Sequence, residues 1–108
     1  MRVAVYAPDL MDRSRIAAAA ERSGTQLVVV STPHELGEVT GADLAVADLG
    51  RPGVVDTARV LSGMATIGFA SHVDRDLLRQ ARQAGWGQVL ARSAFFGRLH
   101  TLLTGDAG

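Results

Sequence analysis

Residues 43–48 read DLAVAD, a run that is apolar at all four interior positions and ends in Asp48. A strand with one solvent-facing side alternates apolar and polar residues, whereas a strand covered on both faces does not alternate. The run therefore predicts a strand inside a sheet that has helices on both faces. Four further short apolar segments also predict strands: residues 2–6, 26–31, 65–70 and 88–91.

Helical periodicity and helix-end signals fill the segments between these strands. The predicted helices span residues 10–23, 33–39, 54–62, 73–84 and 94–103. Gly24, Gly63 and Gly85 close three of them, because glycine readily adopts the left-handed conformation of a helix C-terminus. Thr32 and Glu35 have the spacing of a capping box. Ser71 with Asp74 has a similar spacing, and Ser93 is the predicted cap of the last helix.

Strands that alternate with helices in this way imply parallel strands joined by right-handed crossovers. We predict one α/β domain over residues 1–104, a flavodoxin-like three-layer α/β/α sandwich whose five-stranded sheet has the order 2-1-3-4-5. Residues 105–108 are expected to form a frayed tail. Sites in such sheets lie at the carboxyl ends of the strands. That rule places Asp9, Asp48, Ser71 and Arg92 round one crevice.

The composition excludes several classes of function. The 108 residues are 47% apolar and 20% charged, which suits one packed domain. There is no cysteine and there are three histidines, so thiol chemistry is excluded and a metal site has few ligands. Eleven basic and eleven acidic residues cancel, which gives no charge pattern for nucleic acid or a membrane surface. All eleven basic residues are arginine, so no lysine amine serves catalysis.

Localisation follows from the apolar segments. No apolar run approaches the roughly 20 residues that a membrane span requires. The N-terminus has no apolar stretch of the kind that a signal peptide needs. We therefore expect a cytoplasmic protein with neither a membrane nor a nucleic acid as its partner.

A family resemblance rests on several features that occur in order along the chain. An aspartate, Asp48, ends the third strand, and Pro52 follows four residues later. Residues 83–85 (QAG) close the fourth helix, and Arg92 is a basic residue that ends the fifth strand. In these features, and in its five strand-helix pairs, the chain resembles a two-component response-regulator receiver domain over nearly its whole length.

The resemblance implies a role for each residue at the crevice. In that family, an acidic pair after strand one and the strand-three aspartate hold Mg²⁺, and that aspartate accepts a phosphoryl group. A Ser or Thr ending strand four contacts the phosphate, and a lysine ending strand five pairs with it. By position, these roles fall on Pro8, Asp9, Asp48, Ala70 and Arg92.

The acidic and hydroxyl positions depart from the family. Pro8 leaves Asp9 and Asp48 as the implied metal ligands, and their hold on Mg²⁺ is weak because Mg²⁺ requires several oxygen ligands in near-octahedral geometry. Ala70 has no hydroxyl. Ser71 follows it, but neighbouring residues of a strand point to opposite faces, so Ser71 substitutes only where the backbone has already turned. We expect no tightly bound cofactor.

The basic residue that ends strand five keeps the positive charge found in the family but differs from it in shape. Arg92 carries a planar guanidinium where the family has a compact ammonium. Arg92 pairs either with a phosphorylated Asp48 or permanently with Asp48 or Asp9. Arg51, three residues beyond Asp48, is a second cation that can neutralise the crevice. These departures favour a degenerate receiver, or pseudo-receiver.

The favoured function is a stand-alone signalling or regulatory module that is not an enzyme, acts on a protein partner in trans, and has atypical or absent phosphorylation. The main alternative is a conventional receiver that takes phosphate at Asp48 from a histidine kinase through Mg²⁺. A third possibility is a small-molecule binder that uses the same crevice. A homodimer through the fourth and fifth helices is also expected, with Trp86, Phe95 and Phe96 on an exposed apolar patch.

Structural roles compete with these functional ones. Asp48 before a Gly-Arg-Pro-Gly loop also suits a turn residue that satisfies local backbone donors. Asp9 and Asp12 both suit the start of the first helix, and for Asp12 we favour the capping role. Ser71 is more often a cap than a phosphate contact. His72 is expected to be a solvated loop residue.

Overall fold

The five predicted strands form one parallel sheet, and the structure describes residues 1–61 and 63–104. In this computed structural model the strands are β1 (Arg2–Tyr6), β2 (Gln26–Val29), β3 (Leu44–Asp48), β4 (Ala65–Ala70) and β5 (Gln88–Ala91). Their order is β2-β1-β3-β4-β5, and every neighbouring pair is parallel. The predicted fold class and strand order are confirmed. The predicted tail at 105–108 lies outside the described residues.

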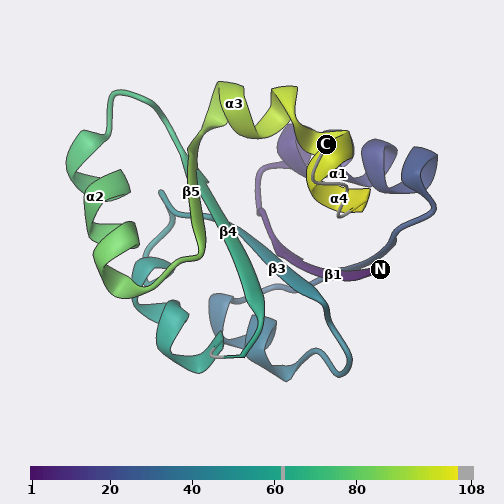
Figure 1. The fold of residues 1–108 in the computed structure, drawn as a ribbon, viewed down its shortest axis with the longest axis horizontal. Helices are drawn as coiled ribbons and strands as arrows, with labels where there is room; N and C mark the ends of the chain where they lie inside the picture. Colours follow the sequence, from purple (N-terminus) through teal and green to yellow (C-terminus); the bar gives the residue numbers. More distant parts are fainter. Residues whose placement is uncertain (62, 105–108) are drawn as a thin grey trace.

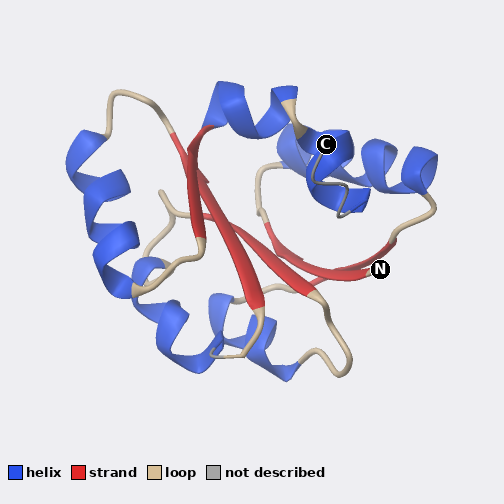
Figure 2. Cartoon of the chain, viewed as in Figure 1, coloured by secondary structure: helices blue, strands red, loops and turns tan. Residues whose placement is uncertain are grey.

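Helical segments cover both faces of this sheet (Figures 1 and 2). One face carries α1 (Leu10–Ser23), α3 (Arg92–Gly97) and α4 (Leu99–Thr104), and the other carries α2 (Arg75–Ala84) and the 3₁₀-helices η1 (Pro33–Glu38) and η2 (Val55–Leu61). Each face has its own buried apolar core. Every residue of β3 is buried, as predicted for a strand covered on both faces. No helix in the described ranges is long and apolar enough to cross a membrane.

Helix α1 has the predicted bounds because both of its ends are capped. At the start, Asp9 Oδ1 accepts a hydrogen bond from the Asp12 N–H at 3.0 Å. At the end, Gly24 has φ +68°, and its N–H donates to the carbonyls of Ala20 and Glu21. The first cap fixes the first turn of α1 at the carboxyl edge of the sheet.

Two of the predicted helices are 3₁₀-helices, η1 and η2. The predicted capping box in η1 is absent, because the Thr32 hydroxyl donates to Glu35 Oε1 at 2.9 Å and does not cap the backbone. The two segments also pack closely, since a Cβ on Gly37 would lie 3.0 Å from the Val60 carbonyl oxygen.

Helix α2 begins two residues later than predicted, at Arg75. The predicted capping box before it is absent. Instead, Ser71 Oγ accepts a hydrogen bond from the Val73 N–H at 3.4 Å, which stabilises the loop ahead of the helix. The Asp74 side chain makes no capping hydrogen bond.

The predicted last helix is divided into α3 and α4 at Arg98. The Arg98 N–H is shared between the carbonyls of Ala94 and Phe95, a three-centre bond of the kind common at helix ends. Ser93 lies inside α3 and is not its cap, because α3 already begins at Arg92.

Trp86 and Phe95 are buried, so the prediction that they face a partner is wrong. Trp86 is 4% exposed and donates its indole N–H to the Val55 carbonyl at 3.0 Å. Phe95 is fully buried and stacks on Phe69 with ring centroids 4.4 Å apart. Both rings fill the cores of the chain itself. Of the three predicted interface residues, Phe96 alone is partly exposed, and the homodimer itself stays a prediction.

Candidate functional site

Asp48 ends β3 at the carboxyl edge of the sheet, where the sequence predicts a site. Its carboxylate is nearly buried, and each oxygen has a partner. Oδ1 accepts a hydrogen bond from the Gly50 N–H at 3.0 Å, and Oδ2 lies 3.5 Å from Arg51 Nε. The first contact is the predicted turn role, and the second is the predicted neutralisation by Arg51. The two roles therefore coexist at Asp48.

Asp12 is the acidic site residue that the sequence analysis misses. The predicted capping role belongs to Asp9, and the Asp12 side chain turns inward and is buried. Asp12 Oδ1 accepts a hydrogen bond from Arg92 Nη2, and the two groups form an ion pair. Arg92 therefore contacts Asp12, instead of the Asp48 or Asp9 expected from the sequence. The signal that could reveal Asp12 is its position four residues before Ile16, on the buried stripe of α1.

The positive charge of Arg92 interacts with three carboxylates, those of Asp12, Asp48 and Asp9. The hydrogen bond with Asp12 raises the pKa of the Arg92 guanidinium, burial opposes that rise, and the negative charges of Asp12, Asp48 and Asp9 add to it. The guanidinium thus remains a fixed cation at the carboxyl edge.

Arg92 reaches Asp12 across an aromatic surface. Arg92 follows β5, whereas Asp12 follows β1, and strands β3 and β4 lie between them in the sheet. The guanidinium carbon lies 5.5 Å from the Phe69 ring centroid and 5.4 Å from that of Phe96. These distances lie within cation–π range. The long arginine side chain therefore connects the end of β5 to α1.

The crevice expected from the sequence is, in the structure, the charged cluster of Asp9, Asp12, Asp48, Arg51 and Arg92. Asp9 is its exposed member. The hydrogen bond from the Asp12 N–H lowers the pKa of the Asp9 carboxyl below its ordinary value of 3.8, against a smaller opposing effect of burial. The Met11 N–H and the positive charges of Arg51 and Arg92 lower it further.

We expect the Asp9 carboxyl to titrate below pH 3.8 in the folded chain. A carboxyl whose pKa is lower in the folded state stabilises the fold above its unfolded pKa, and that contribution is lost as the pH falls through the folded pKa. The carboxyl carbon shift of Asp9, followed by NMR against pH, measures the midpoint. An Asp9 midpoint at or above its ordinary value of 3.8 would contradict this prediction.

Ala70 and Ser71 do not supply the site with a hydroxyl. Ala70 is buried in the core on the α2 side of the sheet. The Ser71 hydroxyl bonds within its own loop, to Val73. In the strand register, the β4 residue opposite Asp48 is Phe69. The structure therefore brings the charged residues of the predicted site together, whereas Ala70 and Ser71 give it no hydroxyl group.

The carboxylates do not fit a magnesium ion. In the described part of the chain, no three side chains of His, Asp or Glu are placed to hold a metal. Pro8 offers no carboxylate, and the two buried carboxylates are bound by guanidinium groups, Asp12 by Arg92 and Asp48 by Arg51. Mg²⁺ requires oxygen ligands in near-octahedral geometry. The crevice is instead neutralised by two arginines.

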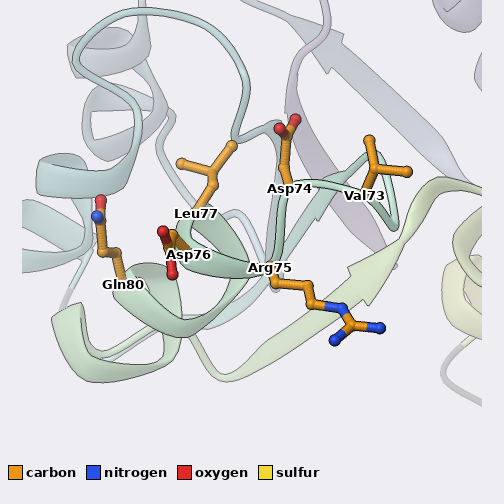
Figure 3. A pocket seen from close by; sticks show the side chains of 6 residues that line it. All are labelled: Val73, Asp74, Arg75, Asp76, Leu77 and Gln80. Carbon is orange, nitrogen blue, oxygen red and sulfur yellow. The ribbon is translucent and has the colours of Figure 1, made fainter.

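A separate hollow lies beside the first turn of α2 and is shown in Figure 3. Its lining is Val73, Asp74, Arg75, Asp76, Leu77 and Gln80. Figure 3 shows that the polar side chains point in different directions. Asp76 is also paired with Arg79 at 2.9 Å. The hollow therefore lacks a convergent set of polar groups, and the crevice at Asp48 remains the candidate site.

Comparison with solved structures gives a consistent class of neighbours. A response regulator from Hahella chejuensis shares 20% identity, with a TM-score of 0.79 over 95% of this chain and 92% of that chain. The signal receiver domain of NarL from Mycobacterium tuberculosis shares 20% identity, with a TM-score of 0.76 over 94% and 90%. The phosphorylated cyanobacterial phytochrome response regulator RcpA shares 15% identity, with a TM-score of 0.74 over 96% and 89%.

The chain therefore has the fold of response-regulator receiver domains, and the fold that the sequence resemblance implies is confirmed. No protein-family model and no curated protein matches the sequence. At these identities the likeness establishes the fold alone, so the function has to be argued from the crevice.

Proposed function

We propose that this chain is a receiver-like regulatory module that acts by contact with a partner protein and does not depend on phosphorylation of Asp48. One observation supports this proposal: both buried carboxylates at the crevice are already paired with guanidinium groups. The module would work in the cytoplasm and would have no catalytic turnover of its own.

The pairing of these carboxylates with arginines affects phosphoryl transfer because it changes the charge at Asp48. Phosphoryl transfer relies on positioning and on cations that neutralise the transferring group. Arg51 already supplies positive charge to Asp48, with its Nε 3.5 Å from Oδ2, so a cation is in place at this carboxylate without a metal and a metal at the same oxygen would have to compete with it. The geometry therefore favours a standing state of the crevice over a phosphorylation cycle.

We expect no phosphorylation when the chain is incubated with acetyl phosphate and Mg²⁺. In a working receiver, an aspartate oxygen attacks phosphorus and acetate leaves, so the intact mass rises by one phosphoryl group. Mass spectrometry of the wild type should show no such rise, and Asp48→Asn should give the same result. An established phospho-accepting receiver provides the positive control. A mass rise in the wild type that is lost in Asp48→Asn would favour the conventional receiver instead.

A further inference from the structure

A groove follows α1 where α3 and α4 pack beside it. Two adjoining hollows, of about 350 and 480 Å³, form this groove and share Arg15, Phe96 and Gly97 in their linings. Ala18 and Ala19 lie between the basic residues of α1, and their short side chains leave the groove open. The groove therefore lies outside the crevice at Asp48, on the helical face opposite α2.

The lining of this groove is basic, with no acidic side chain in either hollow. Its ionisable residues are Arg15, Arg22, Arg92 and His100. Arg92 is paired with Asp12. Arg15 and Arg22 are exposed and form no ion pair with any other described residue. In a chain whose net charge is zero, this local excess of positive charge marks a surface for an anionic group.

Arg15 is already held in place for such a group. Its guanidinium carbon lies 4.0 Å from the centroid of the Phe96 ring. This cation–π contact fixes one face of the guanidinium and leaves its edge N–H groups available to a carboxylate. Less side-chain entropy is lost on binding because the arginine is partly ordered beforehand.

The spacing of the two free arginines defines the shape of the bound segment. Arg15 and Arg22 are seven residues apart on α1, which places them about 10 Å apart along the helix axis. In an extended peptide, carboxylates four residues apart lie on one face and about 13 Å apart, a separation that the long Glu and Arg side chains can bridge. Between the arginines, the apolar surface of Ala18 and Phe96 suits an aliphatic side chain.

We propose that this groove binds an extended acidic segment of a partner protein, with two carboxylates four residues apart and an apolar residue midway between them, so that all three side chains lie on one face. That the partner is a protein rests on the function proposed above. The apolar floor and the separated guanidinium groups favour such a segment over inorganic phosphate, which needs convergent donors. They also favour it over a nucleic acid, since nucleic acid binding requires a longer basic surface.

The groove is connected to the crevice through Arg92. Arg92 and Phe96 both line the groove, and the same Arg92 guanidinium binds Asp12. The carboxylate bound by Arg15 lies in the hollow that Arg92 also lines, and its charge competes with Asp12 for the Arg92 guanidinium. Binding of the acidic segment therefore also perturbs the crevice.

The test is an amide NMR titration of the full chain with the blocked peptide acetyl-Gly-Glu-Ala-Leu-Ala-Glu-Gly-amide. Saturable shifts are expected at Arg15, Arg22, Arg92, Gly97 and His100. The double variant Arg15→Gln, Arg22→Gln should bind the peptide at least about tenfold more weakly, because it loses two charge-assisted contacts. The matched control Arg82→Gln, on α2 across the sheet, should change the affinity less than about twofold.

Several results would overturn the proposal. These are an absence of saturable shifts, equal binding of a peptide with Gln in place of both Glu residues, and unchanged affinity in the double variant with its spectrum still that of the folded chain. Stronger binding of inorganic phosphate or of oligothymidylate at the same residues would also overturn it, since the groove would then be a general anion or nucleic acid site. Phosphorylation of Asp48 in the mass experiment would overturn only the function proposed above, so the two failures are distinguishable.

Discussion

Replacing Arg92 by methionine is expected to lower the free energy of unfolding by about 2 kcal/mol, because the buried Asp12 carboxylate then has no partner. Breaking a fully buried ion pair costs about 3–5 kcal/mol. The expected cost is smaller because the Arg92 side chain is 40% exposed and water screens the pair. Methionine preserves the aliphatic stem beside Phe69 and Phe96. Urea unfolding followed by the fluorescence of Trp86, the single tryptophan, measures the change.

The matched control for Arg92 is Arg79→Met. Arg79 pairs with Asp76 on α2, and both side chains are mostly exposed, so we expect a change below about 0.5 kcal/mol. Adding Asp12→Asn to Arg92→Met should restore part of the lost stability, because the amide removes the unpaired charge. If Arg92→Met costs no more than Arg79→Met, the ion pair at the crevice does not stabilise the fold.

Gly68→Ala is expected to lower the free energy of unfolding by about 2 kcal/mol or more through overpacking. A Cβ on Gly68 would lie 2.5 to 2.7 Å from three side-chain carbons of Leu49, which is itself buried. Leu49 follows Asp48 directly, so the strain falls on the strand end that positions the crevice. Thermal unfolding of the variant measures the loss.

Gly97→Ala is the control for this substitution. A Cβ at Gly97, in α3, meets no atom within 4 Å, and alanine is the better helix former by about 1 kcal/mol. Gly97→Ala should therefore leave the stability unchanged or raise it slightly. Equal losses in the two variants would show that overpacking against Leu49 is not the cause.

The sheet could be predicted from the sequence because its signals are local. The uninterrupted apolar run that ends at Asp48 indicates burial on both faces, and Gly24 and Gly85 mark helix ends that the structure confirms. The type of the short crossover helices could not be predicted in this way. The residues of η1 carry no signal that separates an α-helix from a 3₁₀-helix, and η1 packs closely against η2 at Gly37 and Val60, a contact that is distant in sequence.

Only part of the crevice could be predicted from the sequence, again because the usable signals are local. Asp48, Arg51 and Arg92 could be located because each lies at a strand end or in the loop directly after it. Asp12 could not be distinguished from Asp9 by residue type, since both suit a helix start. The Asp12 side chain turns inward because the periodicity of α1 places it on the same buried stripe as Ile16.

The packing of the two phenylalanines in α3 depends on residues from other elements of the fold. Phe95 and Phe96 are consecutive in α3 and cannot both occupy the centre of one helix face. Phe69, which comes from β4, contacts both rings, with centroids 4.4 and 5.6 Å away. Arg15 of α1 covers Phe96 from outside. These contacts come from other elements of the fold, so the sequence of α3 alone does not reveal them.

The most direct test of a crevice held by arginines compares amide NMR spectra of the chain with and without Mg²⁺ and beryllofluoride, which mimics an aspartyl phosphate. The wild-type spectrum should be unchanged at Asp48, Gly50 and Arg92, and Asp48→Asn should behave in the same way. Saturable shifts at these residues in the wild type that vanish in Asp48→Asn would contradict the proposed function and identify a working phospho-acceptor.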